Sequence, residues 1–177
     1  MRAIVLACLL SLLAGCAEQG EERRIDEHLM AALGQARALH HLADVHLAEG
    51  DTARAEDAVE RILEVDFPAG APERDDVVVD AYGRLAKIRL GQDRLDEAAA
   101  TLQKGYGLGR RDTFYTASLH LIEGEIHEAR SKKAREAGDE PVTRAEARRA
   151  IEAYEESIAI NERVMERIAR EEKEDDR

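Results

Sequence analysis

Six histidines are the residues of this sequence that most suggest metal chemistry: His28, His40, His41, His46, His120 and His127. His120 and His127 are seven residues apart, which on a helix is two turns and about 10 Å along the axis, so one ion cannot bridge them without other ligands. Glu123 and His127 have the i, i+4 spacing of a two-ligand fragment, but zinc sites need three or four protein ligands. We therefore expect these histidines to pack at helix edges, and we assign no metal site.

No catalytic set accompanies the histidines. The sequence has no Ser, Cys or Lys in a recognised nucleophile motif and no phosphate-binding glycine loop between a strand and a helix. The glycine-rich segment 105–109 predicts a turn that unwinds a helix after Lys104. Carboxylates are abundant, but nothing selects one acid and one base among them. We predict that the protein is not an enzyme and uses no cofactor.

Cys16 ends an apolar segment near the start of the chain. Residues 3–14 are apolar or small except for Ser11, and they follow Arg2. Such a segment is typical of a secretory signal and is shorter than the roughly 20 apolar residues that span a bilayer. The sequence Leu-Ala-Gly-Cys over 13–16 resembles the lipobox of bacterial lipoproteins, in which the Cys is lipidated and the chain is cleaved before it. The alternative is a plain signal peptide that happens to precede a Cys.

The lipobox resemblance implies a cleaved signal peptide over 1–15, followed by the lipidated Cys16 and a tether over 16–24. Acyl chains such as palmitate would hold the domain at a membrane surface without spanning it. Because Ala17 rather than Asp follows Cys16, the resemblance implies the outer membrane, facing the periplasm, or the cell surface if the host is not Gram-negative. Cys8 would leave with the signal, so no cysteine pair would remain for a disulfide.

Composition favours one helical domain. The chain has 177 residues, of which 44% are hydrophobic, 36% charged and 3% aromatic, with no Trp. A β-sandwich would need more aromatic and β-branched residues, whereas this length and apolar content suit a single core. The formal net charge of −12 repels a phosphate backbone, so nucleic acid is excluded as a partner.

An internal repeat organises the apolar positions. Small residues recur twelve apart at Ala43 and Ala55 and again at Ala86 and Ala98. Leu39, Leu42, Ala43, Ala55, Val59 and Leu63 are matched 43 residues later by Tyr82, Leu85, Ala86, Ala98, Leu102 and Tyr106. We expect two helical hairpins, with helices over 25–50, 51–66, 77–90 and 93–108 and a loop over 67–75. The first helix should bury one stripe that includes Leu42 and Val45.

A third unit is visible mainly in its second helix, around 150–161. Its first helix should run over 113–137, with Gly124 at the small-residue position. Gly124 and Ala150 are 26 residues apart, fourteen more than in the earlier units. Seven extra residues on each helix are about two turns, so both buried faces keep their register in a longer hairpin. Thr143 and Glu146 have the spacing of a capping box for the second helix.

The pattern resembles the tetratricopeptide repeat, a helix-turn-helix unit of 34 residues in which small residues let paired helices approach. The resemblance implies an all-α fold of about three stacked antiparallel hairpins, a right-handed α-solenoid over 25–170 whose last hairpin is elongated, followed by a charged, fraying tail over 171–177. The sequence departs from the family pattern at Gly83 and over 105–107. A generic bundle of antiparallel helices is the alternative.

Tetratricopeptide proteins commonly bind partners in the concave face made by the first helix of each hairpin. By resemblance, the candidate groove comprises Arg37, His40, Asp44, Leu47, Asp80, Gly83, Lys87, Leu90, Ser118, Leu121, Glu125 and Glu128. The family's carboxylate clamp needs a cluster of cations, and here only Arg37 and Lys87 are cationic. We therefore expect a peptide or protein partner of basic or apolar character.

These observations together predict a membrane-anchored, periplasmic, non-catalytic scaffold for protein–protein interaction, used in the assembly of envelope, pilus or secretion machinery. The alternative is a periplasmic helical protein that binds a small ligand or a metal through its histidines and acids. The partner and the oligomeric state stay open.

Overall fold

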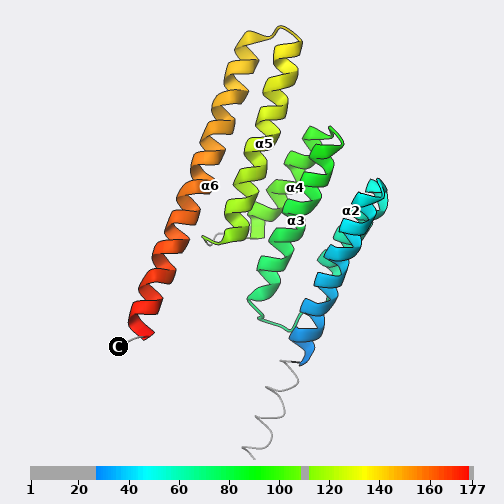
Figure 1. Cartoon of the computed structure of the whole chain (residues 1–177), viewed down its shortest axis with the longest axis vertical. Coiled ribbons are helices and arrows are strands. Elements are labelled where there is room, and N and C mark those ends of the chain that lie inside the picture. Colours follow the sequence, from blue (N-terminus) through cyan, green and yellow to red (C-terminus); the bar gives the residue numbers. More distant parts are fainter. Residues whose placement is uncertain (1–26, 109–111, 176–177) are drawn as a thin grey trace, which may run out of the picture.

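The computed structural model describes residues 27–108 and 112–175, and every regular element within these ranges is helical (Figure 1). The elements are an N-terminal helix over 27–48, α2 (Thr52–Glu60), the 3-10 turn η1 (Arg61–Glu64), α3 (Glu73–Gly91), α4 (Leu95–Leu108), α5 (Phe114–Glu136) and α6 (Glu140–Asp175). In this part of the chain, consecutive helices pair as antiparallel hairpins that stand side by side. The predicted all-α fold of stacked hairpins is confirmed. The expectations for 1–24, including Cys16, lie outside the described residues.

The three hairpin turns close in the same way. Gly50, Asp93 and Gly138 each adopt a positive φ, of 78°, 65° and 76° respectively. In each turn the next residue's backbone N–H reaches back five residues to a carbonyl of the preceding helix, at 2.8–3.0 Å. This is the Schellman ending, which satisfies the last carbonyls of a helix and reverses the chain. The shared turn brings the second helix of each hairpin back along the first.

Small residues lie where the helices of the first two hairpins approach. Ala43 and Ala55 are fully buried in one apolar cluster with Val59 and Ile62. Ala86 and Ala98 are fully buried in the next cluster, which Leu102 shares. A larger side chain at these positions would push the helices apart, so the alanines repeated at the 43-residue offset set the close spacing inside each hairpin.

The last hairpin is held by an even closer contact. A Cβ at Gly124 on α5 would lie 2.3 Å from the Tyr154 ring on α6. Two hydroxyls add interhelical hydrogen bonds: Ser131 Oγ donates to the Thr143 carbonyl at 2.9 Å and Ser157 Oγ to the Ala117 carbonyl at 2.8 Å. At 23 and 36 residues, α5 and α6 are longer than the helices of the earlier hairpins. The predicted elongation of the third unit is confirmed.

A half-buried polar network ties the first hairpin to the second. Arg89 on α3 donates to Glu56 at 3.2 Å, to Glu60 at 3.1 Å and to Thr101 Oγ1 at 2.6 Å. Arg94, in the turn after α3, donates to the same Glu56. The Arg89 and Glu56 side chains are 15% and 13% exposed, so these charge-assisted bonds are screened less than a surface pair. One guanidinium therefore joins α2, α3 and α4.

Two expectations from the sequence, one about burial and one about where a helix ends, are wrong. Leu42 and Val45 are exposed, because they lie on the outer side of the first helix in the stack, and no element in the described residues covers that side. Gly105 does not unwind α4, which continues to Leu108. A Cβ at Gly105 would meet Leu119 at 3.0 Å and Tyr82 at 3.3 Å, so the glycine allows helices to approach closely.

Helix starts also differ from expectation. The Asp139 carboxylate accepts from the Val142 N–H at 3.1 Å, so α6 begins before Thr143, which is buried inside its first turn. The Thr143 hydroxyl donates to the Asp139 carbonyl at 2.8 Å, and the predicted capping box does not form. The loop after the first hairpin runs over 65–72 instead of 67–75, since η1 ends at Glu64 and α3 starts at Glu73. Among the helices of the described ranges, none combines the length and apolar character needed to cross a membrane.

Candidate functional site

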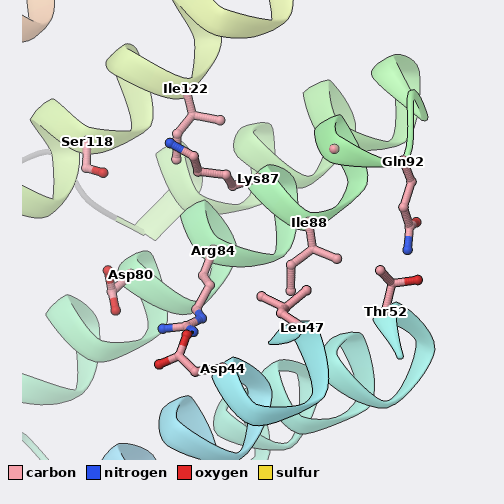
Figure 2. A pocket seen from close by; sticks show the side chains of 11 residues that line it. Asp44, Leu47, Thr52, Asp80, Arg84, Lys87, Ile88, Gln92, Ser118 and Ile122 are labelled. Carbon is pink, nitrogen blue, oxygen red and sulfur yellow. The ribbon is translucent and has the colours of Figure 1, made fainter. Parts of the chain in front are cut away.

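A pocket of about 610 Å³ opens between the N-terminal helix, α3 and α5 (Figure 2). We call it the central pocket. It is lined by Asp44, Leu47, Thr52, Asp80, Arg84, Lys87, Ile88, Gly91, Gln92, Ser118 and Ile122. Most of these residues belong to the first helix of a hairpin, and those on α3 recur every three or four residues, so they share one helical face. Stacking the hairpins brings these faces together into one site.

Apolar side chains form part of the pocket surface. Leu47 of the N-terminal helix lies beside Ile88 of α3, and Ile122 of α5 lies farther along the pocket (Figure 2). Ile88 and Ile122 are buried in the described structure, whereas Leu47 is partly open to solvent. An apolar ligand side chain that covers this surface gains the free energy of removing apolar area from water.

Arg84 crosses from α3 to the first hairpin and connects the charged groups of the pocket. Its guanidinium donates to the Asp44 carboxylate and lies 3.4 Å from His40 Nδ1. On the other side of the ring, His40 Nε2 lies 3.3 Å from the Asp80 carboxylate. A neutral imidazole that accepts at Nδ1 and donates from Nε2 satisfies both contacts. The four side chains thus form a chain of polar contacts between the hairpins.

Burial governs the protonation of this group. Burial lowers the pKa of His40, and the nearby Arg84 charge lowers it further, while Asp80 and Asp44 act in the opposite direction. Burial also raises the pKa of Asp80, against the opposing effects of His40 and Arg84. The lowered pKa favours the neutral imidazole that the hydrogen-bond geometry requires.

The structure brings together part of the sequence-predicted groove. Asp44, Leu47, Asp80, Lys87 and Ser118 line the central pocket. His40 does not line the pocket but contacts two residues that do, Asp80 and Arg84. Glu125 receives a hydrogen bond of 3.0 Å from Lys87. Glu125 and Glu128 line a second pocket, of about 730 Å³, between α5 and α6.

Other predicted groove residues lie elsewhere. Arg37 and Leu121 are exposed outside the central pocket. Leu90 packs against the apolar cluster of the second hairpin. Gly83 faces α5, where an added Cβ would lie 3.2 Å from Leu119, so it is a helix contact and not a groove residue. Gly83, Leu90 and Leu121 are each one residue before a residue that lines the pocket, whereas Arg37 is seven residues before Asp44.

Sequence reasoning missed the residue that organises the pocket. Arg84 follows Asp80 by four residues and precedes Ile88 by four, so helical spacing alone would place all three on one face. Thr52, Ile88, Gly91, Gln92 and Ile122 were also missed. Thr52 and Gln92 lie near the turns, where the family pattern gave no expectation. The i, i+4 relation between Asp80 and Arg84 was the available signal.

A second polar cluster lies between the second and third hairpins. Tyr106 Oη donates to Glu123 at 2.8 Å, and His120 Nδ1 lies 3.3 Å from the same carboxylate oxygen. The hydrogen bond from His120 is the main cause that lowers the pKa of Glu123, against the effect of burial. Burial and the hydrogen bond to Glu123 raise the pKa of Tyr106. These groups satisfy one another across the helix interface.

His120 and His127, the pair closest to a metal-site spacing, bind different carboxylates. His127 Nδ1 lies 2.6 Å from the buried Glu146 carboxylate on α6, while Glu123 is held by Tyr106 and His120. The i, i+4 pair of Glu123 and His127 therefore divides between two helix interfaces. Within the described ranges, no three His, Cys, Asp or Glu residues are arranged to hold a metal ion.

The stacked hairpins and a pocket built from their first helices define the class as a helical-repeat protein. A tetratricopeptide repeat matches residues 36–67, which span most of the N-terminal helix, α2 and η1. Proteins with this repeat are generally non-catalytic interaction modules that bind protein partners, so the repeat indicates a protein–protein interaction scaffold. Comparison with curated proteins and with solved structures gave no match.

Proposed function

We propose that this chain is a membrane-anchored lipoprotein of the periplasm that holds a segment of a partner protein in the central pocket. The single observation that carries the binding role is the pocket itself, in which Leu47 and Ile88 meet the charged side chains of Asp44, Asp80 and Arg84. The tetratricopeptide repeat at 36–67 supports a scaffold.

The charges of the pocket favour an apolar segment with a basic residue. Arg84 is paired with Asp44, and Lys87 with Glu125, so the two cations of the pocket lining are committed to carboxylates of the chain itself. Among the described residues, Asp80 has an ion-pair distance only to His40, and its side chain is 41% exposed. A ligand carboxylate would have to displace a carboxylate already bound, whereas a Lys or Arg of the ligand can approach Asp80 directly.

The anchor is proposed from the sequence over 13–16. Lipid at Cys16 would keep the domain at the outer membrane, and the tether would raise the local concentration of the pocket for partners at the same surface. Assembly of envelope, pilus or secretion machinery is the use that such an arrangement suits.

The anchor is tested by Cys16→Ser, with Cys8→Ser as the matched control. We expect Cys16→Ser to abolish palmitate labelling and to move the protein from the membrane to the soluble fraction of the host. Cys8→Ser, which lies inside the proposed signal, should change neither. An unchanged membrane fraction for Cys16→Ser would contradict the anchor.

The binding role is tested by a photo-crosslinking amino acid placed at Ser118 in living cells, with Phe114 as the control. Both positions are on α5, one turn apart, but only Ser118 lines the central pocket. We expect a discrete cross-linked protein from position 118, absent from position 114 and lost when Leu47→Asp is added. Cross-linking of equal strength from position 114, or none from 118, would refute the pocket as the binding site.

A further inference from the structure

One face of α6 carries large apolar side chains that the described structure leaves in solvent. Ile151, Ile158 and Met165 follow one another at intervals of seven residues and are 55%, 58% and 60% exposed. The helix packs on α5 through a different side, which includes the buried Ala150, Ala153, Ser157 and Ile160. We call the side that carries the three exposed residues the free face of α6. Apolar residues repeated every seven positions supply one of the two seam positions in each heptad of a pair of helices.

Charges divide along the free face. Between 144 and 172 this face carries Arg144, Arg148 and Glu155 before its midpoint and Glu162, Glu166 and Glu172 after it, with Glu140 and Lys173 just beyond the two ends. At 100° per residue these side chains project within about 60° of the direction of Ile151. Two such helices side by side in parallel would set arginines against arginines and glutamates against glutamates. In antiparallel order each basic end meets an acidic end, which favours that order.

We propose that two copies of this chain pair through the free face of α6, antiparallel, about a two-fold axis at Ile158. The axis puts Ile158 of each copy against Ile158 of the other and Ile151 against Met165. It also brings Arg144 beside Glu172. The pattern therefore complements itself, as a contact between identical surfaces must. Residues 144–172 give a shared helical length of about 42 Å.

The pairing uses a surface that is separate from the proposed binding site. None of the residues that line the central pocket belongs to α6. A dimer of this kind presents two central pockets, and a partner with two binding segments would gain avidity from both. The inference does not depend on the proposed function, since the free face is described by exposure and charge alone.

Another apolar side offers a competing arrangement that the test must separate. Val45 on the outer side of the N-terminal helix is 54% exposed, and Met30 lies on the same helix. Contact between this side and α6 of the next copy would join different surfaces. Such a contact does not close on itself and produces chains of increasing length.

Sedimentation equilibrium on the full chain, with Cys8→Ser and Cys16→Ser and in density-matched detergent, measures the pairing. We expect a monomer–dimer equilibrium in which Ile158→Glu raises the dissociation constant about 100-fold, because two isoleucines at the axis lose their burial. Val45→Glu is the matched control, also an exposed apolar residue on a helix, and should leave the constant unchanged. Circular dichroism checks that both variants fold.

Three results would overturn the proposal: a monomer at about 100 µM, a dimer that Ile158→Glu does not weaken, or an association that Val45→Glu abolishes. Cysteine cross-linking in the same background then fixes the order of the helices. Ile158→Cys should cross-link to itself, and Ile151→Cys should cross-link only when mixed with Met165→Cys. Self-cross-linking of Ile151→Cys would show parallel helices and refute the two-fold axis.

Discussion

Replacing Gly124 by Ala tests the close contact between α5 and α6. Gly124 lies in the middle of α5, and the methyl group of an alanine there would lie 2.3 Å from Tyr154 Cε1 and 2.6 Å from Cδ1. Carbon atoms in contact need about 3.5–4.0 Å. The ring cannot stay in place, and when it moves it gives up the 2.7 Å hydrogen bond from its hydroxyl to Glu128.

Two opposing contributions set the size of the effect. Overpacking costs typically 1–3 kcal/mol, about 2 here, and loss of the exposed hydrogen bond adds about 0.5 kcal/mol. Against this, alanine is better than glycine in a helix interior by about 1 kcal/mol. The free energy of unfolding should therefore fall by about 1.5 kcal/mol. Gly34→Ala, in the N-terminal helix with nothing within 4 Å of the added carbon, should instead raise it by about 1 kcal/mol.

Urea unfolding followed by circular dichroism measures both variants. A double-mutant cycle with Tyr154→Ala separates the contributions, because without the ring Gly124→Ala should become stabilising, like Gly34→Ala. If Gly124→Ala stabilises the protein with Tyr154 intact, the contact between α5 and α6 is not as close as described. The reasoning about small residues between the helices of this hairpin would then fail.

Three further substitutions test the hairpins and their junction. Ala98→Asp should lower the free energy of unfolding by more than about 3 kcal/mol in urea titrations, because it buries a charge between helices; a loss under about 1 kcal/mol would count against that contact. Arg89→Met should cost about 2 kcal/mol by removing the charged donor that joins α2, α3 and α4, and an unchanged unfolding midpoint would mean that the network adds nothing. Because the pKa of His40 is lowered in the folded protein, the stability that this group contributes is present above the unfolded pKa of 6.5 and is lost as the pH falls below 6.5. The pKa of Asp80 is raised, so protonation of this carboxylate adds stability in more acidic solution. His40→Gln should therefore lose less stability than the unmodified protein between about pH 7 and pH 5, as thermal melts at each pH would show, and equal losses would refute the assignment.

The repeat in the sequence was enough to predict the hairpins. Alanine pairs twelve residues apart identified the helix contacts of the first two units, and the same offset placed Leu102 correctly in the core. The third unit was predicted from Gly124 and Ala150, even though its helices are longer. Small residues are informative here because only they fit where two helices touch, so their spacing in the sequence indicates where the helices of a hairpin contact each other.

The side chains of the groove were harder to predict. Register carried from a family pattern placed Asp44 and Asp80 in the pocket, but not Arg84, whose role depends on reaching across to another hairpin. The i, i+4 spacing from Asp80 could have placed Arg84 on the pocket face, but its partner Asp44 is 40 positions away in the sequence and no local pattern indicates that contact. Leu42 and Val45 fitted an apolar stripe, yet their burial depended on a neighbour that the described part of the chain does not supply. Gly105 belongs to a glycine-rich segment of the kind found in turns. The close approach of Leu119 explains why a glycine occupies this position inside a helix.

The two arginines of α3 have a mechanical consequence. Arg84 and Arg89 are five positions apart and project from roughly opposite sides of the helix, one bound to Asp44 and the other to Glu56. Together they resist tilting of the first hairpin toward or away from the second. The width of the central pocket is thereby fixed before the proposed partner segment binds, and a fixed width would lower the entropy lost on binding.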